Sequence, residues 1–241
     1  MGLFSRKPCV IVASMGRSGS TMLTQSLSAL ARKQWHGPLG TVFGIRPEYD
    51  DVFTFEESLA DAPLTPGIIC KTHDYPDDLR QATRDFRAVY IFGSAYESAL
   101  SVHSCLDRRG ADWVEEHFRH LKSTSNIAHL FDCDALNMAR NLASWATFDA
   151  ATVLCIRYET LWDRVDQVAE FTGYRFQPPP FEKRAPKAIE PDLAAKAHAV
   201  YDPIDAIIET LPDIFMSGPE MTDQVSALLD FGEDRPAAQY C

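Results

Sequence analysis

The sequence has no long apolar run and no surplus of positive charge. Although 46% of its 241 residues are hydrophobic, no stretch approaches the roughly 20 apolar residues that a membrane-spanning helix needs, so we expect no membrane span. Acidic residues outnumber basic ones by 34 to 23, which gives a formal net charge of −11. Because binding along the phosphates of a nucleic acid needs a broad basic face, nucleic acid is excluded as the expected partner.

The sequence also lacks closely spaced cysteines. Its six cysteines are scattered, with no CxxC pair. Three of them, Cys9, Cys70 and Cys155, lie in apolar runs, where we expect a buried thiol in its reduced form. No apolar stretch precedes a small-residue cleavage site near residue 1. These features predict a protein of the reducing cytoplasm.

Four short apolar runs are present and predict buried strands. They cover residues 9–14, 67–71, 88–92 and 152–157. Their β-branched residues do not alternate with polar ones, as is typical of parallel strands that are covered on both faces. Helical patterns follow at residues 20–33, 94–105, 112–122, 135–147, 161–172 and 191–200. The alternation of strand and helix predicts an α/β fold with three layers, a central parallel sheet between helices.

Two segments do not fit this alternation. Residues 35–66 are rich in aromatic residues, glycine and proline and predict an irregular excursion. Residues 201–241 carry nine acidic side chains and one basic one, and we expect a loosely held acidic tail from about residue 220.

A glycine-containing turn joins the first predicted strand to the first helix. Gly16 and Gly19 allow the backbone to bend sharply and to approach a ligand. The first amides of the following helix attract an anion, and the helix dipole adds to this attraction. The same turn supplies one cation and three hydroxyl groups, on Arg17, Ser18, Ser20 and Thr21. It therefore predicts a site for a phosphate-like anion, although a lone G-x-x-G is more often an ordinary capped turn.

This turn is not a Walker A loop. The pattern GxxxxGK[ST] would need lysine where Ser20 stands and glycine where Ser14 stands. The difference argues against ordinary ATP or GTP hydrolysis and favours another phosphate-bearing donor.

The second predicted strand ends in Lys71-Thr72-His73. Residues two apart on an extended chain project to the same side, and ligands bind at the carboxyl ends of parallel strands. A neutral imidazole can accept a proton from a hydroxyl, and an ammonium can stabilise developing negative charge. Lys71 and His73 are therefore candidates for a catalytic pair, the alternative being a solvated strand end with an incidental histidine.

Together these segments resemble the sulfotransferase family, which uses 3′-phosphoadenosine 5′-phosphosulfate (PAPS). Arg17-Ser18-Gly19-Ser20-Thr21 is similar to the family's 5′-phosphosulfate loop, and Gly16 extends the match to bacterial and carbohydrate sulfotransferases. Lys71-Thr72-His73 looks like the catalytic segment of the cytosolic members. Tyr158, in the segment Tyr158-Glu159-Thr160-Leu161, looks like a tyrosine that lies near the adenine in the family.

The resemblance implies a fold like that of the P-loop nucleoside triphosphate hydrolases, with residues 1–241 forming one sulfotransferase-like domain. It implies that His73 is the general base, and that Lys71 and Arg17 stabilise the transferring sulfuryl group. Donor-binding residues would be Gly16, Arg17, Ser18, Gly19, Ser20, Thr21, Ser101 and Tyr158. The acceptor would be a small molecule or a carbohydrate.

The chain departs from the family at the 3′-phosphate motif. Ser101 is retained, but Gly93 stands where the family has an arginine, and Met22 replaces a tryptophan that stacks on adenine. The pairs Arg108-Arg109 and Lys183-Arg184 are candidates to compensate for the missing arginine. Two alternatives therefore stay open: a non-catalytic nucleotide-binding protein, and a phosphotransferase with an atypical phosphate loop.

We expect no metal ion. His117 and His120 lie one helical turn apart in a predicted helix, but no third ligand and no HExxH motif accompany them. Neither the identity of the acceptor nor the oligomeric state follows from the sequence.

Overall fold

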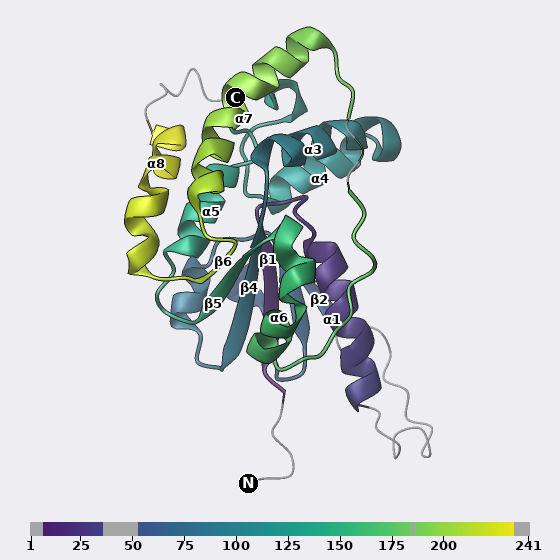
Figure 1. Cartoon of the computed structure of the whole chain (residues 1–241), viewed down its shortest axis with the longest axis vertical. Helices are drawn as coiled ribbons and strands as arrows, with labels where there is room; N and C mark the ends of the chain where they lie inside the picture. Colours follow the sequence, from purple (N-terminus) through teal and green to yellow (C-terminus); the bar gives the residue numbers. More distant parts are fainter. Residues whose placement is uncertain (1–6, 36–52, 184, 186, 234–241) are drawn as a thin grey trace.

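A six-stranded sheet forms the centre of the computed structural model, which describes residues 7–35, 53–183, 185 and 187–233 (Figure 1). The strand order is β2-β3-β1-β4-β5-β6. The strands are β1 (Cys9–Ser14), β2 (Phe53–Glu56), β3 (Ile69–Thr72), β4 (Phe86–Phe92), β5 (Val153–Arg157) and β6 (Ile214–Met216). All neighbours pair in parallel except β6, which runs antiparallel to β5 at one edge.

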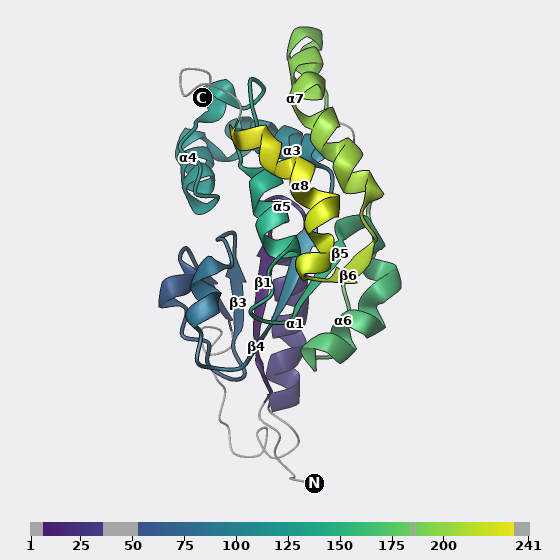
Figure 2. The same ribbon diagram turned by 90° about the vertical axis from the view of Figure 1, so that its left-hand side faces the viewer.

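Helices pack on both faces of this sheet (Figures 1 and 2). Buried residues of α1 (Ser20–Trp35) and α6 (Val165–Thr172) form the core on one face. The core on the other face includes residues of α3 (Ala95–Arg109), α4 (Ala111–His120), α5 (Met138–Ala146), α7 (Pro191–Thr210) and α8 (Thr222–Glu233). The three-layer α/β architecture with its largely parallel sheet is confirmed.

The central strand β1 shows why the apolar runs do not alternate. Ile11 and Ala13 point into one core, and Val10 and Val12 point into the other. All four side chains are fully buried. Since the pleat sends successive residues to opposite faces, a strand between two helical layers must be apolar throughout.

Two expectations about irregular segments are wrong where the structure describes them. Phe53–Glu56 is strand β2, paired in register with β3, so part of the predicted excursion belongs to the sheet. The remaining residues 36–52 of that excursion lie outside the described residues. The acidic segment from about residue 220 is not a loose tail up to Glu233, because Val225 and Leu228 of α8 are buried against the core. Acidic residues on its exposed side concealed this apolar face.

Several helix boundaries differ from the predicted ones. Helix α7 continues ten residues beyond Val200 and contains Pro203, because Ile204 and Ile208 keep the apolar face in the core. The first part of the helix predicted at 161–172 is a 3-10 turn, η5 (Tyr158–Arg164). No helix among the described residues is long and apolar enough to cross a bilayer.

Candidate active site

The turn between β1 and α1 has an unusual backbone. Gly16, Arg17 and Gly19 all have positive φ angles, of 86°, 52° and 93°. Such angles are easy for glycine but cost another residue about 1–3 kcal/mol, so Arg17 is held in a strained conformation. A Cβ atom at Gly19 would collide with the ring of Tyr158. The loop is therefore shaped by backbone requirements at three neighbouring positions.

Hydroxyl groups fix this loop to the sheet. Ser18 Oγ donates to the carbonyl oxygen of Ile91 at 2.9 Å, at the end of the neighbouring strand β4. Ser14 Oγ and Ser20 Oγ lie 3.0 Å apart and connect the two ends of the loop. Thr21 is exposed. Two of the three predicted loop hydroxyls thus hold the loop in place, a role that the sequence pattern did not specify.

Arg17 extends from the loop toward α3 and α4. Its Nε donates to Ser101 Oγ at 3.0 Å, and its guanidinium carbon lies 5.7 Å from the ring centroid of Trp113. The two predicted donor-binding residues Arg17 and Ser101 are therefore in direct contact. Their contact fixes the direction of a planar cation that has five N–H donors.

His73 lies directly after β3 and against the same loop. Its Nδ1 is 3.1 Å from the carbonyl oxygen of Ser14 and 3.1 Å from Ser14 Oγ. Since a carbonyl oxygen can only accept, the contact requires the proton on Nδ1, which leaves the Nε2 lone pair available. The parallel pairing of β3 with β1 brings these residues, 59 apart in the sequence, together.

A second hydrogen-bonded layer holds the backbone around His73. Asn141 of α5 donates from Nδ2 to the carbonyl oxygen of His73 at 3.3 Å and accepts from Tyr90 Oη at 2.9 Å. Trp145 Nε1 donates to the carbonyl oxygen of Asp74 at 2.9 Å. All three supporting side chains are fully buried. The strand end therefore has a rigid support, as a catalytic group requires.

Lys71 is close to both cationic and aromatic groups. Its Nζ lies 4.9 Å from the ring centroid of Phe55 on β2, and the ring of His73 lies 6.3 Å from the same ring. Burial, and next the positive charge of Arg17, lower the pKa of Lys71 to about 8. A neighbouring positive charge that lowers the pKa of an ammonium group indicates that an anion close to both would be favourable.

The imidazole of His73 is neutral in this environment. Burial, and next the charge of Lys71, lower the pKa of His73 to about 3, against the opposing contribution of its bond to Ser14. A neutral imidazole is the form that accepts a proton. An anion bound between Lys71 and Arg17 would offset their charges and raise the basicity of His73.

Helix α4 contributes a wall that the sequence patterns did not assign to the site. Trp113 and His117 lie one turn apart and stack with their ring centroids 5.1 Å apart. The ring of His117 meets that of His73 edge to face at 5.6 Å. The sequence suggested at most a metal role for His117 and gave no reason to place Trp113 in the site. The i, i+4 spacing was the available signal, but it does not say which way a helix face points.

Tyr158 also lies at the loop. Its ring covers Gly19 and meets Trp162 edge to face at 5.3 Å. On the same side, a Cβ atom at Gly93 would lie 3.5 Å from Glu159 Oε1. A carboxylate therefore stands beside the position where the resembling family has its 3′-phosphate arginine.

The candidate replacements for that arginine lie in different places. Arg109 lies 5.1 Å from the ring centroid of Trp113, the same indole that Arg17 approaches. Arg108 folds back onto Ser104, to whose carbonyl oxygen its Nε donates at 3.0 Å. Lys183 is exposed and Arg184 lies outside the described residues. Of these candidates, Arg109 is the one that shares with Arg17 a contact to the Trp113 ring.

One trio of metal-ligating side chains occurs among the described residues. Single ligand atoms of Glu57, Glu116 and His120 all lie within 4.8 Å of one another. Arg119 forms ion pairs with both carboxylates, at 3.3 Å and 3.7 Å, so that its guanidinium offsets part of their charge. His117, the other half of the predicted histidine pair, does not belong to this group.

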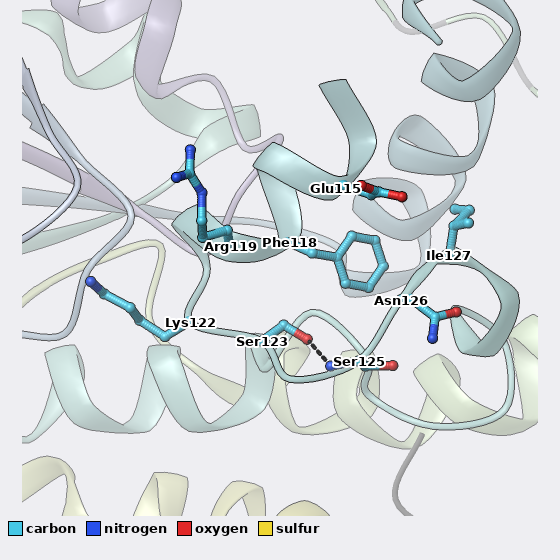
Figure 3. A pocket seen from close by; sticks show the side chains of 8 residues that line it. All are labelled: Glu115, Phe118, Arg119, Lys122, Ser123, Ser125, Asn126 and Ile127. Carbon is cyan, nitrogen blue, oxygen red and sulfur yellow. Dashed lines mark hydrogen bonds between the residues drawn. The ribbon is translucent and has the colours of Figure 1, made fainter. Parts of the chain in front are cut away.

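A cavity of about 410 Å³ lies on another face of α4 (Figure 3). Phe118, Asn126 and Ile127 converge on it, whereas Arg119 and Lys122 extend toward the opposite side. Lys122 Nζ donates to the carbonyl oxygen of Glu57 at 2.8 Å. None of the predicted site residues lines this cavity. The cavity is therefore distinct from the phosphate loop, which Figure 1 shows at the upper end of β1.

Comparison with known proteins adds little to this geometry. No protein-family model and no curated protein matches the sequence. Among solved structures, one match is retinol dehydratase in complex with androsterone and the inactive cofactor PAP. It is 18% identical, with a TM-score of 0.33, and the match covers 95% of this chain and 83% of the other. At that distance the likeness carries no argument about function.

Proposed function

We propose that this protein transfers a sulfuryl group from PAPS to the hydroxyl group of an acceptor, with His73 as general base. The observation that carries the proposal is the contact between His73 and Ser14. It joins an imidazole with an available Nε2 lone pair to Ser14, the last residue of β1 before the loop that we assign to the oxyanion. The resemblance to sulfotransferases in the loop and in Lys71-Thr72-His73 supports the same assignment.

In this mechanism the chain supplies position and charge. Arg17, Lys71 and the amides at the start of α1 stabilise negative charge on the sulfuryl oxygens and on the leaving phosphate. His73 Nε2 takes the hydroxyl proton as the acceptor oxygen forms its bond to sulfur. The bond between sulfur and the phosphate oxygen breaks, and adenosine 3′,5′-bisphosphate leaves with the electron pair. His73 then releases this proton to bulk solvent, because its lowered pKa disfavours the imidazolium form.

The residues of the site suit the 5′-phosphosulfate end of PAPS better than its 3′-phosphate end. To the 5′-phosphosulfate we assign two cations, Arg17 and Lys71, and the strained loop. Around the 3′-phosphate, Gly93 and the nearby Glu159 offer no positive charge. We therefore assign Ser101 and Arg109 to the 3′-phosphate, because Ser101 contacts Arg17 and Arg109 approaches the same indole ring as Arg17. The acceptor class stays within small molecules and carbohydrates, and the glycine at position 16 favours carbohydrate.

The test combines binding with turnover. We expect wild-type protein to bind adenosine 3′,5′-bisphosphate in a calorimetric titration and to transfer ³⁵S from labelled PAPS to members of a panel of sugars and phenols. His73→Ala should keep nucleotide affinity within a few-fold but lose at least about 100-fold in turnover, because a positioned general base contributes about 10²–10⁴-fold. Undiminished turnover in His73→Ala would contradict the assignment of the base.

A second candidate, a nucleotide-binding protein without transferase activity, is favoured by Gly93 and Glu159. Comparison of adenosine 3′,5′-bisphosphate with adenosine 5′-phosphate separates the two. A sulfotransferase should prefer the bisphosphate, while equal affinities would favour a protein that does not recognise the 3′-phosphate. Turnover that needs ATP and Mg²⁺ would instead indicate a phosphotransferase.

A further inference from the structure

His117 has a buried nitrogen that the proposed mechanism does not use. The residue is 6% exposed, and its Nε2 is fully buried without a hydrogen-bond partner among the residues that the structure describes. Burying an unpaired polar atom costs free energy, and native structures rarely accept that cost without a reason. The most direct reason is a ligand that completes the bond.

The unpaired nitrogen faces the phosphate loop. A Cβ atom built at Gly16 would lie 3.5 Å from His117 Nε2, so this nitrogen is close to the loop backbone at Gly16. The methyl carbons of Leu121 lie 3.2 Å and 3.3 Å from the same Cβ position, so Nε2 and this apolar side chain together border the space beside Gly16. The nitrogen is therefore within reach of a group that the loop binds.

The orientation of the His117 ring is fixed from two sides. Trp113 stacks on it with an interplanar angle of 10°, and His73 meets it edge to face at 83°. His120, the other histidine of α4, instead places its Nε2 3.2 Å from Glu57 Oε1. The two histidines of α4 therefore have different surroundings: His120 contacts Glu57, whereas His117 faces the phosphate loop.

We propose that His117 is a further oxyanion ligand, whose Nε2–H donates to an oxygen of the sulfuryl or phosphate group held in the loop. This inference rests on the proposed function for the identity of the donor, but its chemistry requires only a tetrahedral oxyanion. Burial, followed by the charges of its neighbours, lowers the pKa of His117 well below its ordinary value. The imidazole is therefore neutral and has one N–H to donate, without adding a third charge beside Lys71 and Arg17.

The first experiment compares two substitutions at His117. Glutamine can place an N–H close to the position of Nε2, whereas phenylalanine keeps the flat ring but has no donor. We expect His117→Phe to weaken binding of adenosine 3′,5′-bisphosphate about 10- to 100-fold, as a lost hydrogen bond to a charged group should. His117→Gln should stay within about threefold of wild type. His129→Gln, at an exposed position in η4 (Ile127–His129), serves as the control.

The second experiment does not depend on the nucleotide. In ¹⁵N spectra of the imidazole groups, the His117 resonances are assigned by their loss in His117→Gln. Titration of wild-type protein with inorganic sulfate should shift the Nε2 resonance of His117 and slow the exchange of its proton, and should leave His129 unchanged. A shift from sulfate without any binding of the nucleotide would support this inference while contradicting the proposed donor.

Two results would overturn the inference. One is equal loss of affinity in His117→Phe and His117→Gln, which would indicate that the ring only packs. The other is a His117 resonance that does not respond to sulfate or to the nucleotide. If His117→Phe fails to fold, the wild-type spectra still decide the question.

Discussion

Arg17 Nε donates to Ser101 Oγ at 3.0 Å, joining residues that are 84 positions apart. The same arginine has a φ angle of 52°, which only glycine adopts without cost. The strained residue is thus the one that supplies the cation of the loop. Such strain commonly occurs at functional sites, where the surrounding structure maintains it.

Two substitutions of Arg17 separate strain from function. Arg17→Ala and Arg17→Gly both remove the guanidinium, so both should reduce the affinity for adenosine 3′,5′-bisphosphate at least about tenfold. Only glycine relieves the backbone, and Arg17→Gly should therefore be more stable than Arg17→Ala by about 0.5–1 kcal/mol. Urea unfolding gives the stabilities and calorimetry the affinities. Equal stability of the two variants would show that the backbone at position 17 carries no strain.

The loop and the Lys71-Thr72-His73 segment could be predicted because each is a short continuous motif next to a buried strand. Their juxtaposition followed from the rule that the ends of parallel strands meet at one edge of a sheet. The specific contact of His73 with Ser14 requires β3 to pair with β1, and the strand order was not in the pattern.

Other features of the fold and of the candidate site depend on tertiary packing, which no local sequence pattern encodes. Trp113 and His117 have the spacing of any apolar helix face, and only the packing of α4 turns that face toward the loop. Strand β2 has four residues and owes its place to pairing with β3. The buried face of α8 rests on few apolar residues in an acidic segment, so composition alone concealed it.

Substitution of Gly19 should lower the stability of the protein for two reasons, which a control variant can separate. Its φ angle of 93° disfavours alanine, and a Cβ atom there would collide with Tyr158. Gly110, at the end of α3, has a φ of 86° but nothing within 4 Å of an added Cβ. We expect Gly110→Ala to cost about 1–2 kcal/mol in unfolding free energy. Gly19→Ala should cost more and should also weaken nucleotide binding.

Urea unfolding of Gly19→Ala, Gly110→Ala, Tyr158→Ala and the double variant Gly19→Ala/Tyr158→Ala checks this prediction. The double variant removes the collision but keeps the unfavourable φ angle. Adding Gly19→Ala to the Tyr158→Ala variant should therefore lower the free energy of unfolding by about as much as Gly110→Ala lowers it in the wild type. A Gly19→Ala variant as stable as Gly110→Ala would contradict the close packing of Tyr158 on the loop.

The pKa of Lys71 predicts how donor affinity varies with pH. Since burial and Arg17 lower this pKa to about 8, the ammonium of the free protein loses its proton as the pH rises above 8. An anionic ligand favours the protonated form, so affinity for adenosine 3′,5′-bisphosphate should fall by up to about tenfold per pH unit above 8. The phosphates do not contribute, because their second pKa is about 6.

Lys71→Arg provides the matched control, because arginine stays charged throughout this range. Its affinity should be constant from pH 7 to 9.5, while Lys71→Met should bind weakly and equally at every pH. Calorimetry in buffers of different ionisation enthalpy should also show proton uptake on binding by wild type near pH 8. Wild-type affinity that does not change across this range would contradict a lowered pKa for Lys71.

Two adjacent leucines in α8 test whether the acidic C-terminal segment belongs to the folded core. Leu228 is 1% exposed, whereas Leu229 is 45% exposed. Leu228→Ala should reduce the free energy of unfolding by about 2–5 kcal/mol, because it removes buried methyl groups and leaves a cavity. Leu229→Ala should change it by less than about 0.5 kcal/mol. Equal effects in urea unfolding would mean that α8 is not docked in solution, and the segment would then be the loose tail that its charge suggested.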